Sequence, residues 1–271
     1  MKTFFKIQIE IKNSQEAEMM IAELCENNYY AFEEENNFLN AYVTEEDFDE
    51  EKLKEILPFG TIFETHVIEE ENWNQQWESS LQPVVINNFV AIRPSFHDAI
   101  NNAMHDLIIT PKMSFGTGHH ATTHLMVELM EMIDFTNKSV VDFGTGTGVL
   151  AILAEKCGAS KIVGVDYDEW SIKNALENVE KNNCQKIILK QQSNLSGIDV
   201  ADIILANINL NIIKNEALSI SSITKTGSLL LVSGFLISDE AEMKSIFEEK
   251  DFVKIKSKQR GDWAVILFEK S

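Results

Sequence analysis

The first 70 positions alternate between apolar and polar residues in a way that predicts short strands and helices. Every second residue over 5–11 is apolar, as in a strand that buries one face. Met20, Ile21 and Leu24 then share one face of a helix. The expected elements are a strand over 2–11, a helix over 17–25, a strand over 38–43, a helix over 50–57 and a strand over 61–68. This order predicts a small α/β sandwich with an antiparallel sheet.

In the second half of the chain, buried strands and amphipathic helices alternate regularly, which indicates a parallel sheet covered on both faces. The expected strands cover 139–143, 161–166, 186–190, 202–206 and 228–233. After a helix over 240–249, the segments 252–257 and 263–269 flank a Gln-Arg-Gly-Asp turn and are expected to close the sheet as an antiparallel hairpin. Ahead of the sheet, the segments 89–96 and 106–113 are expected to pair as a further hairpin.

Between these two patterns lies an acidic stretch with Trp73 and Trp77 one helical turn apart. This spacing predicts a linker helix with an aromatic face, which more often packs against protein than stacks on bases. The predicted boundaries are therefore a small domain over 1–68, a linker helix over 69–82 and a larger domain over 83–271.

The strongest chemical signal is the glycine turn, Gly144 to Gly148, in which glycines alternate with threonines. Alternating glycines after a buried strand predict a sharp turn into a helix, where a nucleotide-like ligand lies close to the backbone. Val149 stands where the third glycine of a GxGxxG dinucleotide motif belongs, which counts against a nicotinamide dehydrogenase. Asp166 ends the next strand and is suited to accept both hydroxyls of a ribose. Together the turn and the acid predict an adenosine-type ligand.

Net charge and hydropathy limit the kinds of binding partner and the cellular location that we expect. The net charge of −20 disfavours a phosphate backbone and suits a basic protein partner, although it also serves solubility. No uncharged run is long enough to span a bilayer, and the amino end reads as a strand rather than a signal peptide. A cytoplasmic protein without membrane contact is therefore expected.

The cysteines and histidines do not form a metal motif. The three cysteines are widely spaced and odd in number. His120 and His124 stand one helical turn apart, but the glutamate of an HExxH motif is missing. No metal is expected, and His119 or His120 is a better candidate for a wall of the active site.

Four motifs, in their order and spacing, give the chain a family resemblance. They are Phe115-Gly116-Thr117-Gly118-His119-His120-Ala121-Thr122-Thr123, Asp142-Phe143-Gly144-Thr145-Gly146-Thr147-Gly148, Gly164-Val165-Asp166 and Ala206-Asn207-Ile208. They resemble the ribosomal protein L11 methyltransferases of the PrmA type, within the class I S-adenosylmethionine-dependent methyltransferases. The second and third motifs alone indicate only that broad class, whereas the first and last narrow it to the family. The resemblance implies a doubly wound, seven-stranded Rossmann-like sheet preceded by a small ferredoxin-like α+β domain.

The resemblance also implies S-adenosylmethionine as the cofactor and a set of site residues. The implied cofactor-binding residues are Thr123, Asp142, Gly144, Thr145, Gly146, Asp166 and Asn207, and the implied catalytic residues are Asn207, Phe115 and Thr117. The glycine turn would cradle the methionyl end, and Asp166 would bind the ribose. Asp142 would either pair with the ammonium group of the ligand or cap the following helix. Phe115, in a loop with hinge glycines, would cover the cofactor, and Asn207 would accept a hydrogen bond from the target nitrogen.

The activity implied by the resemblance is methylation of lysine side chains and of the N-terminal amine of ribosomal protein L11 by a monomeric enzyme that does not bind nucleic acid directly. The alternative is a class I methyltransferase that acts on another protein or on a small-molecule amine. Glutamine methyltransferases carry Asn-Pro-Pro-Tyr after the fourth strand, whereas this chain has Asn-Ile-Asn-Leu at 207–210. In the first domain, Glu33, Glu34 and Glu35 are expected to grip the basic substrate.

Overall fold

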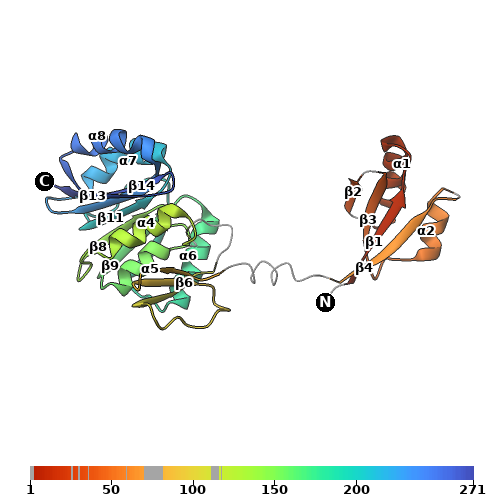
Figure 1. Ribbon diagram of the computed structural model, residues 1–271, viewed down its shortest axis with the longest axis horizontal. Coiled ribbons are helices and arrows are strands. Elements are labelled where there is room, and N and C mark those ends of the chain that lie inside the picture. The colour runs from red at the N-terminus through yellow and green to blue at the C-terminus, as the bar shows by residue number, and fades with distance from the viewer. Residues whose placement is uncertain are drawn as a thin grey trace. The chain divides into compact units, whose positions relative to one another are not determined.

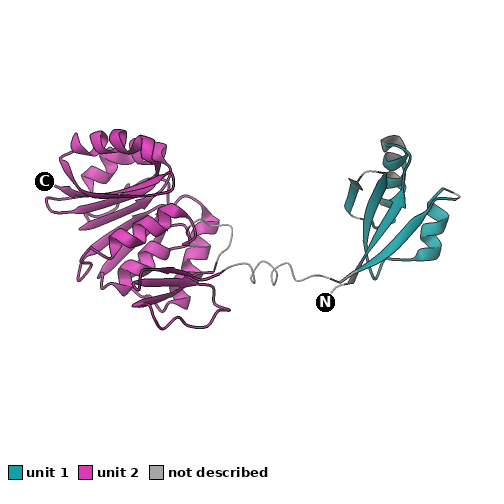
Figure 2. Ribbon diagram, viewed as in Figure 1, with its two compact units in different colours: residues 1–80 teal, residues 81–271 magenta. Residues whose placement is uncertain are grey.

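The structure is a computed structural model of the 271-residue chain, and it describes residues 3–25, 27–29, 31–35, 37–58, 60–69, 82–110, 116 and 118–271. The chain forms two compact units, residues 1–80 and 81–271, which Figure 2 shows in teal and magenta. Trp73 and Trp77 of the expected linker helix lie outside the described residues.

In its described residues, the first unit has a four-stranded antiparallel sheet and two helices. Its elements are β1 (Thr3–Glu10), α1 (Ser14–Cys25), β2 (Ala31–Glu35), β3 (Phe38–Thr44), α2 (Glu50–Ile56) and β4 (Phe63–Glu69), and the strand order is β2-β3-β1-β4 (Figure 1). Ile7 and Ile9 of β1, Leu39 of β3 and Leu53 of α2 are fully buried in one apolar cluster. This βαββαβ arrangement confirms the ferredoxin-like fold expected for this part of the chain.

The strand β2 is absent from the elements that the sequence pattern predicts, so the expectation of three strands is wrong. The run of glutamates over 33–35 hides the strand because it breaks the alternation of apolar and polar residues. β2 lies at the edge of the sheet and pairs with β3, so its outer side can stay polar. Tyr42 of β3 donates a hydrogen bond to Glu33 across this pair at 2.8 Å.

The second unit is built on a seven-stranded sheet of order β10-β9-β8-β11-β12-β14-β13. The strands are β8 (Ser139–Phe143), β9 (Lys161–Asp166), β10 (Ile187–Gln191), β11 (Ile203–Asn207), β12 (Leu229–Leu236), β13 (Phe252–Arg260) and β14 (Trp263–Lys270). The helices are α4 (Ala121–Met130), α5 (Val149–Lys156), α6 (Glu169–Lys181), α7 (Leu210–Ser222) and α8 (Glu240–Glu248), with a short 3₁₀ helix, η1 (Ile237–Asp239). β8 to β12 pair in parallel, while β14 pairs antiparallel with both β12 and β13. The doubly wound sheet and its closing hairpin are thus confirmed.

Helices cover both faces of this sheet because its strands are apolar on both sides. In β8, Val140 belongs to the apolar cluster that includes α4, α5 and α6, whereas Val141 belongs to the one that includes α7 and α8. Figure 1 shows α7 and α8 on the other side of the sheet from α4 and α5. The central strand therefore reads as a continuous apolar run rather than an alternating one. None of the helices in the described part of the chain has the length and apolar character that a bilayer span requires.

A small three-stranded sheet precedes α4 and corrects one expectation. It contains β5 (Val84–Ile86), β6 (Val90–Arg93) and β7 (His105–Ile108). The tight turn at Asn87, with φ of +50°, joins β5 and β6 as the hairpin, whereas β6 and β7 run parallel. The expected hairpin of 89–96 with 106–113 is therefore wrong. Arg93 and Asp106 fix the parallel pair instead, through an ion pair at 2.7 Å.

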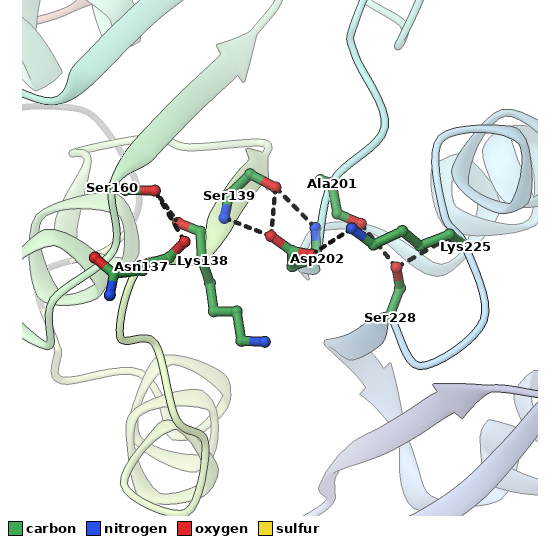
Figure 3. Close-up of polar contacts among 8 residues, drawn as sticks. All are labelled: Asn137, Lys138, Ser139, Ser160, Ala201, Asp202, Lys225 and Ser228. Atoms are coloured by element: carbon green, nitrogen blue, oxygen red, sulfur yellow. Dashed lines mark hydrogen bonds and ion pairs between the residues drawn. The ribbon is translucent and has the colours of Figure 1, made fainter.

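The amino ends of β8 and β11 are joined by a polar cluster around Asp202 (Figure 3). The Oδ2 atom of Asp202 accepts hydrogen bonds from Ser139 N at 2.9 Å and from Ser139 Oγ at 2.8 Å. Lys225 forms an ion pair with Asp202 at 2.7 Å. The hydrogen bond from Lys225 and those from Ser139 lower the pKa of Asp202 to about 2. The cluster fixes the sheet at the end opposite to the carboxyl ends of the strands.

Candidate functional site

A cavity of about 510 Å³ lies at the carboxyl ends of the parallel strands. Doubly wound sheets bind their ligands at this edge, where the loops after neighbouring strands meet. The lining residues come from six strands, from the segments that follow them and from the start of one helix: Phe143, Gly144 and Gly146 at or after the end of β8, Asp166, Tyr167, Asp168 and Ser171 at or after the end of β9, Gln192 and Ser193 after β10, Asn207, Ile208, Asn209 and Ile212 at or after the end of β11, Gly234 and Trp263 in β12 and β14, and His120 and Thr122 at α4.

The glycine turn forms the floor of this cavity. Gly144 and Gly146 have φ of +76° and +52° and line the cavity, so the backbone is exposed to a ligand there. The N–H groups of Gly144 and Thr145 donate to Val165 O at 2.8 and 2.9 Å, which ties the turn to β9. Gly148 serves packing instead. A Cβ on it would lie 3.3 Å from Ala175 Cβ, so its lack of a side chain lets α6 pack closely.

Asp166 joins the glycine turn to the end of β9. Its Oδ2 accepts from Gly146 N at 2.9 Å, and its Oδ1 accepts from Asp168 N at 3.0 Å. The side chain is 9% exposed and lines the cavity. An ionised carboxylate has about four acceptor positions, so two remain for hydroxyl donors of a ligand. This geometry suits the expected contact with a ribose.

Asp142 lies behind the turn and is fully buried. Its Oδ2 accepts from Thr145 Oγ1 at 2.7 Å and from Ala151 N, in the first turn of α5, at 3.2 Å. Among the described residues, its Oδ1 has no hydrogen-bond partner. Burial raises the pKa of Asp142 to about 7. One oxygen therefore caps α5, whereas Asp142 does not line the cavity, so its pairing with an ammonium group stays a prediction. Thr145 orients Asp142 and does not line the cavity.

Asn207 ends β11 and presents an amide at the wall of the cavity. Its Nδ2 donates to Thr123 Oγ1 at 3.3 Å, while its Oδ1 is buried and lacks a partner among the described residues. Thr123 is fully buried in the first turn of α4, and its neighbour Thr122 lines the cavity in its place. The structure thus brings Thr123 to Asn207 rather than to the cavity.

Another part of the wall is aromatic. The rings of His120 and Trp263 meet edge to face with centroids 4.8 Å apart. His120 is the N-cap of α4, and its Nδ1 lies 2.8 Å from Thr122 Oγ1. His119 points elsewhere, with Nε2 2.9 Å from Gln82 O. Of the two histidines considered as a wall, His120 lines the cavity.

Two expectations remain, the catalytic roles of Phe115 and Thr117 and the question of a metal site. Phe115 and Thr117, expected to be catalytic, lie outside the described residues and stay predictions. Within the described residues, no three metal-binding side chains gather at one point. Sequence reasoning missed Gly234, Ile208 and Trp263. A lone glycine inside an apolar strand could have drawn attention to Gly234, because such glycines mark bulges or close approaches.

The residues present fit S-adenosylmethionine, which is a cation without phosphate groups. Two carboxylates, Asp142 and Asp166, lie at the turn. Among the described residues, Asp142 Oδ1 has no hydrogen-bond partner and no lysine or arginine lines the cavity. Such a site favours an ammonium and a sulfonium and repels the pyrophosphate of a dinucleotide. A Cβ on Gly144 would lie 1.9 Å from Ile208 Cγ2, so the wall of the cavity at this point requires a glycine.

Comparisons with known proteins agree with this chemistry. The family model described as ribosomal protein L11 methyltransferase (PrmA) matches residues 4–271. A protein of Bacteroides thetaiotaomicron named ribosomal protein L11 methyltransferase is 35% identical over 260 residues, with 93% of each chain covered. A protein of the same name from Chlorobaculum parvum is 35% identical over 266 residues, covering 93% of this chain and 92% of the relative.

Among solved structures, the ribosomal protein L11 methylase from Lactobacillus delbrueckii subsp. bulgaricus is similar, with a TM-score of 0.65 and 25% identity. The match covers 70% of this chain and 100% of that one. The expected family, Rossmann-like sheet and methyl donor, S-adenosylmethionine, are thereby confirmed. Because the family model spans almost the whole chain, this protein belongs to the PrmA family of methyltransferases.

Proposed function

We propose that this protein transfers methyl groups from S-adenosylmethionine to amines of ribosomal protein L11, namely lysine side chains and the N-terminal amine. The observation that carries the proposal is the buried Oδ1 of Asn207 at the wall of the cavity, which has no hydrogen-bond partner among the described residues. The names of the relatives favour L11 over the alternative acceptor, another protein or a small-molecule amine.

The donor end of the reaction is assigned to the glycine turn and its two acids. Gly144 and Gly146 would hold the methionyl part, and Asp166 would accept the ribose hydroxyls. Asp142, through its free Oδ1, would attract the ammonium group. When bound, S-adenosylmethionine supplies an electrophilic methyl group on its sulfonium. The protein then has to present a neutral amine in line with the carbon–sulfur bond.

The acceptor end is assigned to Asn207. Its Oδ1 accepts one N–H of the amine, which leaves the lone pair of the nitrogen directed at the methyl carbon. Thr123 keeps the amide oriented because it accepts from Nδ2. A free lysine has a pKa of about 10.4, and removal from water beside a sulfonium lowers it. The amine would therefore lose its proton to water and meet the methyl group as a neutral nucleophile, with S-adenosylhomocysteine as the leaving group. Phe115 and Thr117 are proposed to complete this site.

The division of labour along the chain is also part of the proposal. Residues 1–68 would recognise the substrate, 69–82 would form a linker helix, and 83–271 would carry out methyl transfer. The glutamates over 33–35 lie on the edge strand β2, where an added basic segment of a partner meets acidic side chains. The net charge of −20 supports a basic protein partner and disfavours direct contact with nucleic acid. The enzyme would act as a monomer in the cytoplasm, where ribosomal proteins are modified.

The test is methyl transfer to purified L11 of the same organism. Mass spectrometry of the intact substrate should show mass increments of whole methyl groups, and peptide mapping should place them on lysines and the N-terminus. Asn207→Ala should abolish the increments while S-adenosylhomocysteine still binds. Asn211→Ala, an exposed asparagine four residues further along, is the matched control and should keep full activity. An unmodified L11, with label instead on another protein or a small amine, would overturn the choice of substrate.

A further inference from the structure

Thr147, in the glycine turn, holds a residue that is distant in the sequence. Its Oγ1 donates a hydrogen bond to the carbonyl oxygen of Gly116 at 2.7 Å, and Thr147 is fully buried. Gly116 has a φ of +111°, and a Cβ on it would lie 2.7 Å from the same Oγ1. The contact therefore requires a glycine at 116 and a hydroxyl at 147.

Two asparagines, Asn178 of α6 and Asn182 at its C-cap, hold the chain ahead of Gly116. Asn182 brackets Ile108, because its Oδ1 accepts from Ile108 N at 2.9 Å and its Nδ2 donates to Ile108 O at 2.7 Å. Asn178 lies one turn earlier, and its Oδ1 accepts from Thr110 N at 2.9 Å. The two asparagines are 4% and 0% exposed. Since they are four residues apart, their side chains lie on one side of the helix end. They form hydrogen bonds with the backbone of residues 108 and 110, as a neighbouring strand would.

Asn178 also connects this arrangement to the glycine turn. Its Nδ2 donates to Thr147 O at 2.9 Å. Thr147 therefore forms two hydrogen bonds, one to Asn178 through its carbonyl and one to Gly116 through its hydroxyl. Thr147 is thus tied to the chain on both sides of the stretch that leads into α4. The first turn of α4 carries Thr122, which lines the cavity, and Thr123, which orients Asn207.

We propose that Thr147 is a positioning residue for methyl transfer. Its hydroxyl fixes Gly116 on the glycine turn and thereby fixes the amino end of α4, so that Thr123 holds Asn207 in the orientation that the acceptor amine requires. The effect on the reaction passes through α4 and not through the donor, because Thr147 does not line the cavity. The inference rests on the proposed function for the role of Asn207 and for the identity of the acceptor.

The test compares Thr147→Ser with Thr147→Ala, because these variants differ by one oxygen atom. We expect kcat at saturating donor and acceptor to be about tenfold lower for alanine than for serine. The Kd of S-adenosylhomocysteine, measured by calorimetry, should differ by less than about threefold. Amide hydrogen exchange of a peptide covering 118–123 should be faster in the alanine variant. The last two measurements need no acceptor, so they remain decisive if L11 is not the substrate.

Thr224 offers a matched control. Its Oγ1 donates to Ser221 O at 2.8 Å just after α7, which is the same kind of bond away from the cavity. Thr224→Ser and Thr224→Ala should have equal kcat. The inference is overturned if the two variants at 147 also have equal kcat, or if the alanine variant only lowers the unfolding midpoint. It is overturned as well if Kd rises by the same factor by which kcat falls, since Thr147 would then act through the donor.

Discussion

Gly234 is predicted to be the glycine at which a single methyl group disturbs the site most. It lies in β12 with φ of +99°, at the irregularity in the pairing of β12 with β14. A Cβ at this position would lie 2.1 Å from Ile208 O and 2.7 Å from Ile208 C. These are backbone atoms of the residue that follows Asn207, so no side-chain rotation relieves the collision.

The magnitude for Gly234→Ala follows from two costs. A left-handed backbone costs an alanine about 1–2 kcal/mol, and overpacking costs about 1–3 kcal/mol more. The free energy of unfolding should therefore fall by about 2–5 kcal/mol. Carbon and oxygen at 2.1 Å must separate by about 1 Å to reach ordinary contact. A displacement of this size at Asn207 lowers the rate of methyl transfer by about 100-fold.

Gly227→Ala separates the two costs. Gly227 has a similar φ of +82°, but no heavy atom of the described residues lies within 4 Å of a Cβ built on it. Urea unfolding followed by tryptophan fluorescence should show a loss of about 1–2 kcal/mol for Gly227→Ala, and its methyl transfer rate should be unchanged. Equal losses of stability in the two variants, with normal activity for Gly234→Ala, would refute the proposed contact between β12 and residue 208.

Three further predictions concern the acids. Asp166→Asn should weaken S-adenosylhomocysteine binding by about 100-fold in calorimetry. The reason is that the single oxygen of an amide cannot accept from two backbone N–H groups and from a ribose as well. An unchanged Kd would contradict the assignment of the ribose to Asp166. Because the pKa of Asp142 is raised to about 7 and only its ionised form attracts an ammonium, Kd should tighten about tenfold from pH 6 to pH 8 and lose this dependence in Asp142→Asn; the same pH dependence in both proteins would disprove it. The pKa of Asp202 is lowered to about 2, so its contribution to stability is present above about pH 4 and is lost as the pH falls towards 2. Asp202→Asn should therefore cost about 1–2 kcal/mol at pH 7 and nothing near pH 2; a difference that is constant with pH would rule this out.

The sequence allowed the fold of the second unit to be predicted because its signals are local. The glycine turn, Asp166 and Asn207 each stand at the carboxyl end of a strand that the apolar pattern reveals. Parallel strands bring these ends to one edge, so their proximity follows from topology alone. By contrast, β2 carries glutamates where an alternating strand would show apolar residues, and its pairing partner decides its structure.

The aromatic part of the cavity wall, and the asparagines that hold the chain ahead of α4, could not be predicted in this way. Trp263 reaches the cavity only because β14 inserts antiparallel beside β12, which places a distant residue next to α4. Asn178 and Asn182 read as ordinary polar helix positions, and their burial depends on residues 108–110, which the pattern had assigned to a hairpin. Pairing of this kind depends on tertiary contacts that no local pattern encodes.

The central claim is that the cavity between the glycine turn and Asn207 holds the methyl donor. A crystal structure of the protein with S-adenosylhomocysteine tests it most directly. The account predicts the ribose hydroxyls on Asp166, the amino-acid end at Gly144 and Gly146, and the sulfur facing the side of the cavity that carries Asn207 Oδ1. Density for the ligand elsewhere on the chain, or a ribose directed away from Asp166, would contradict it.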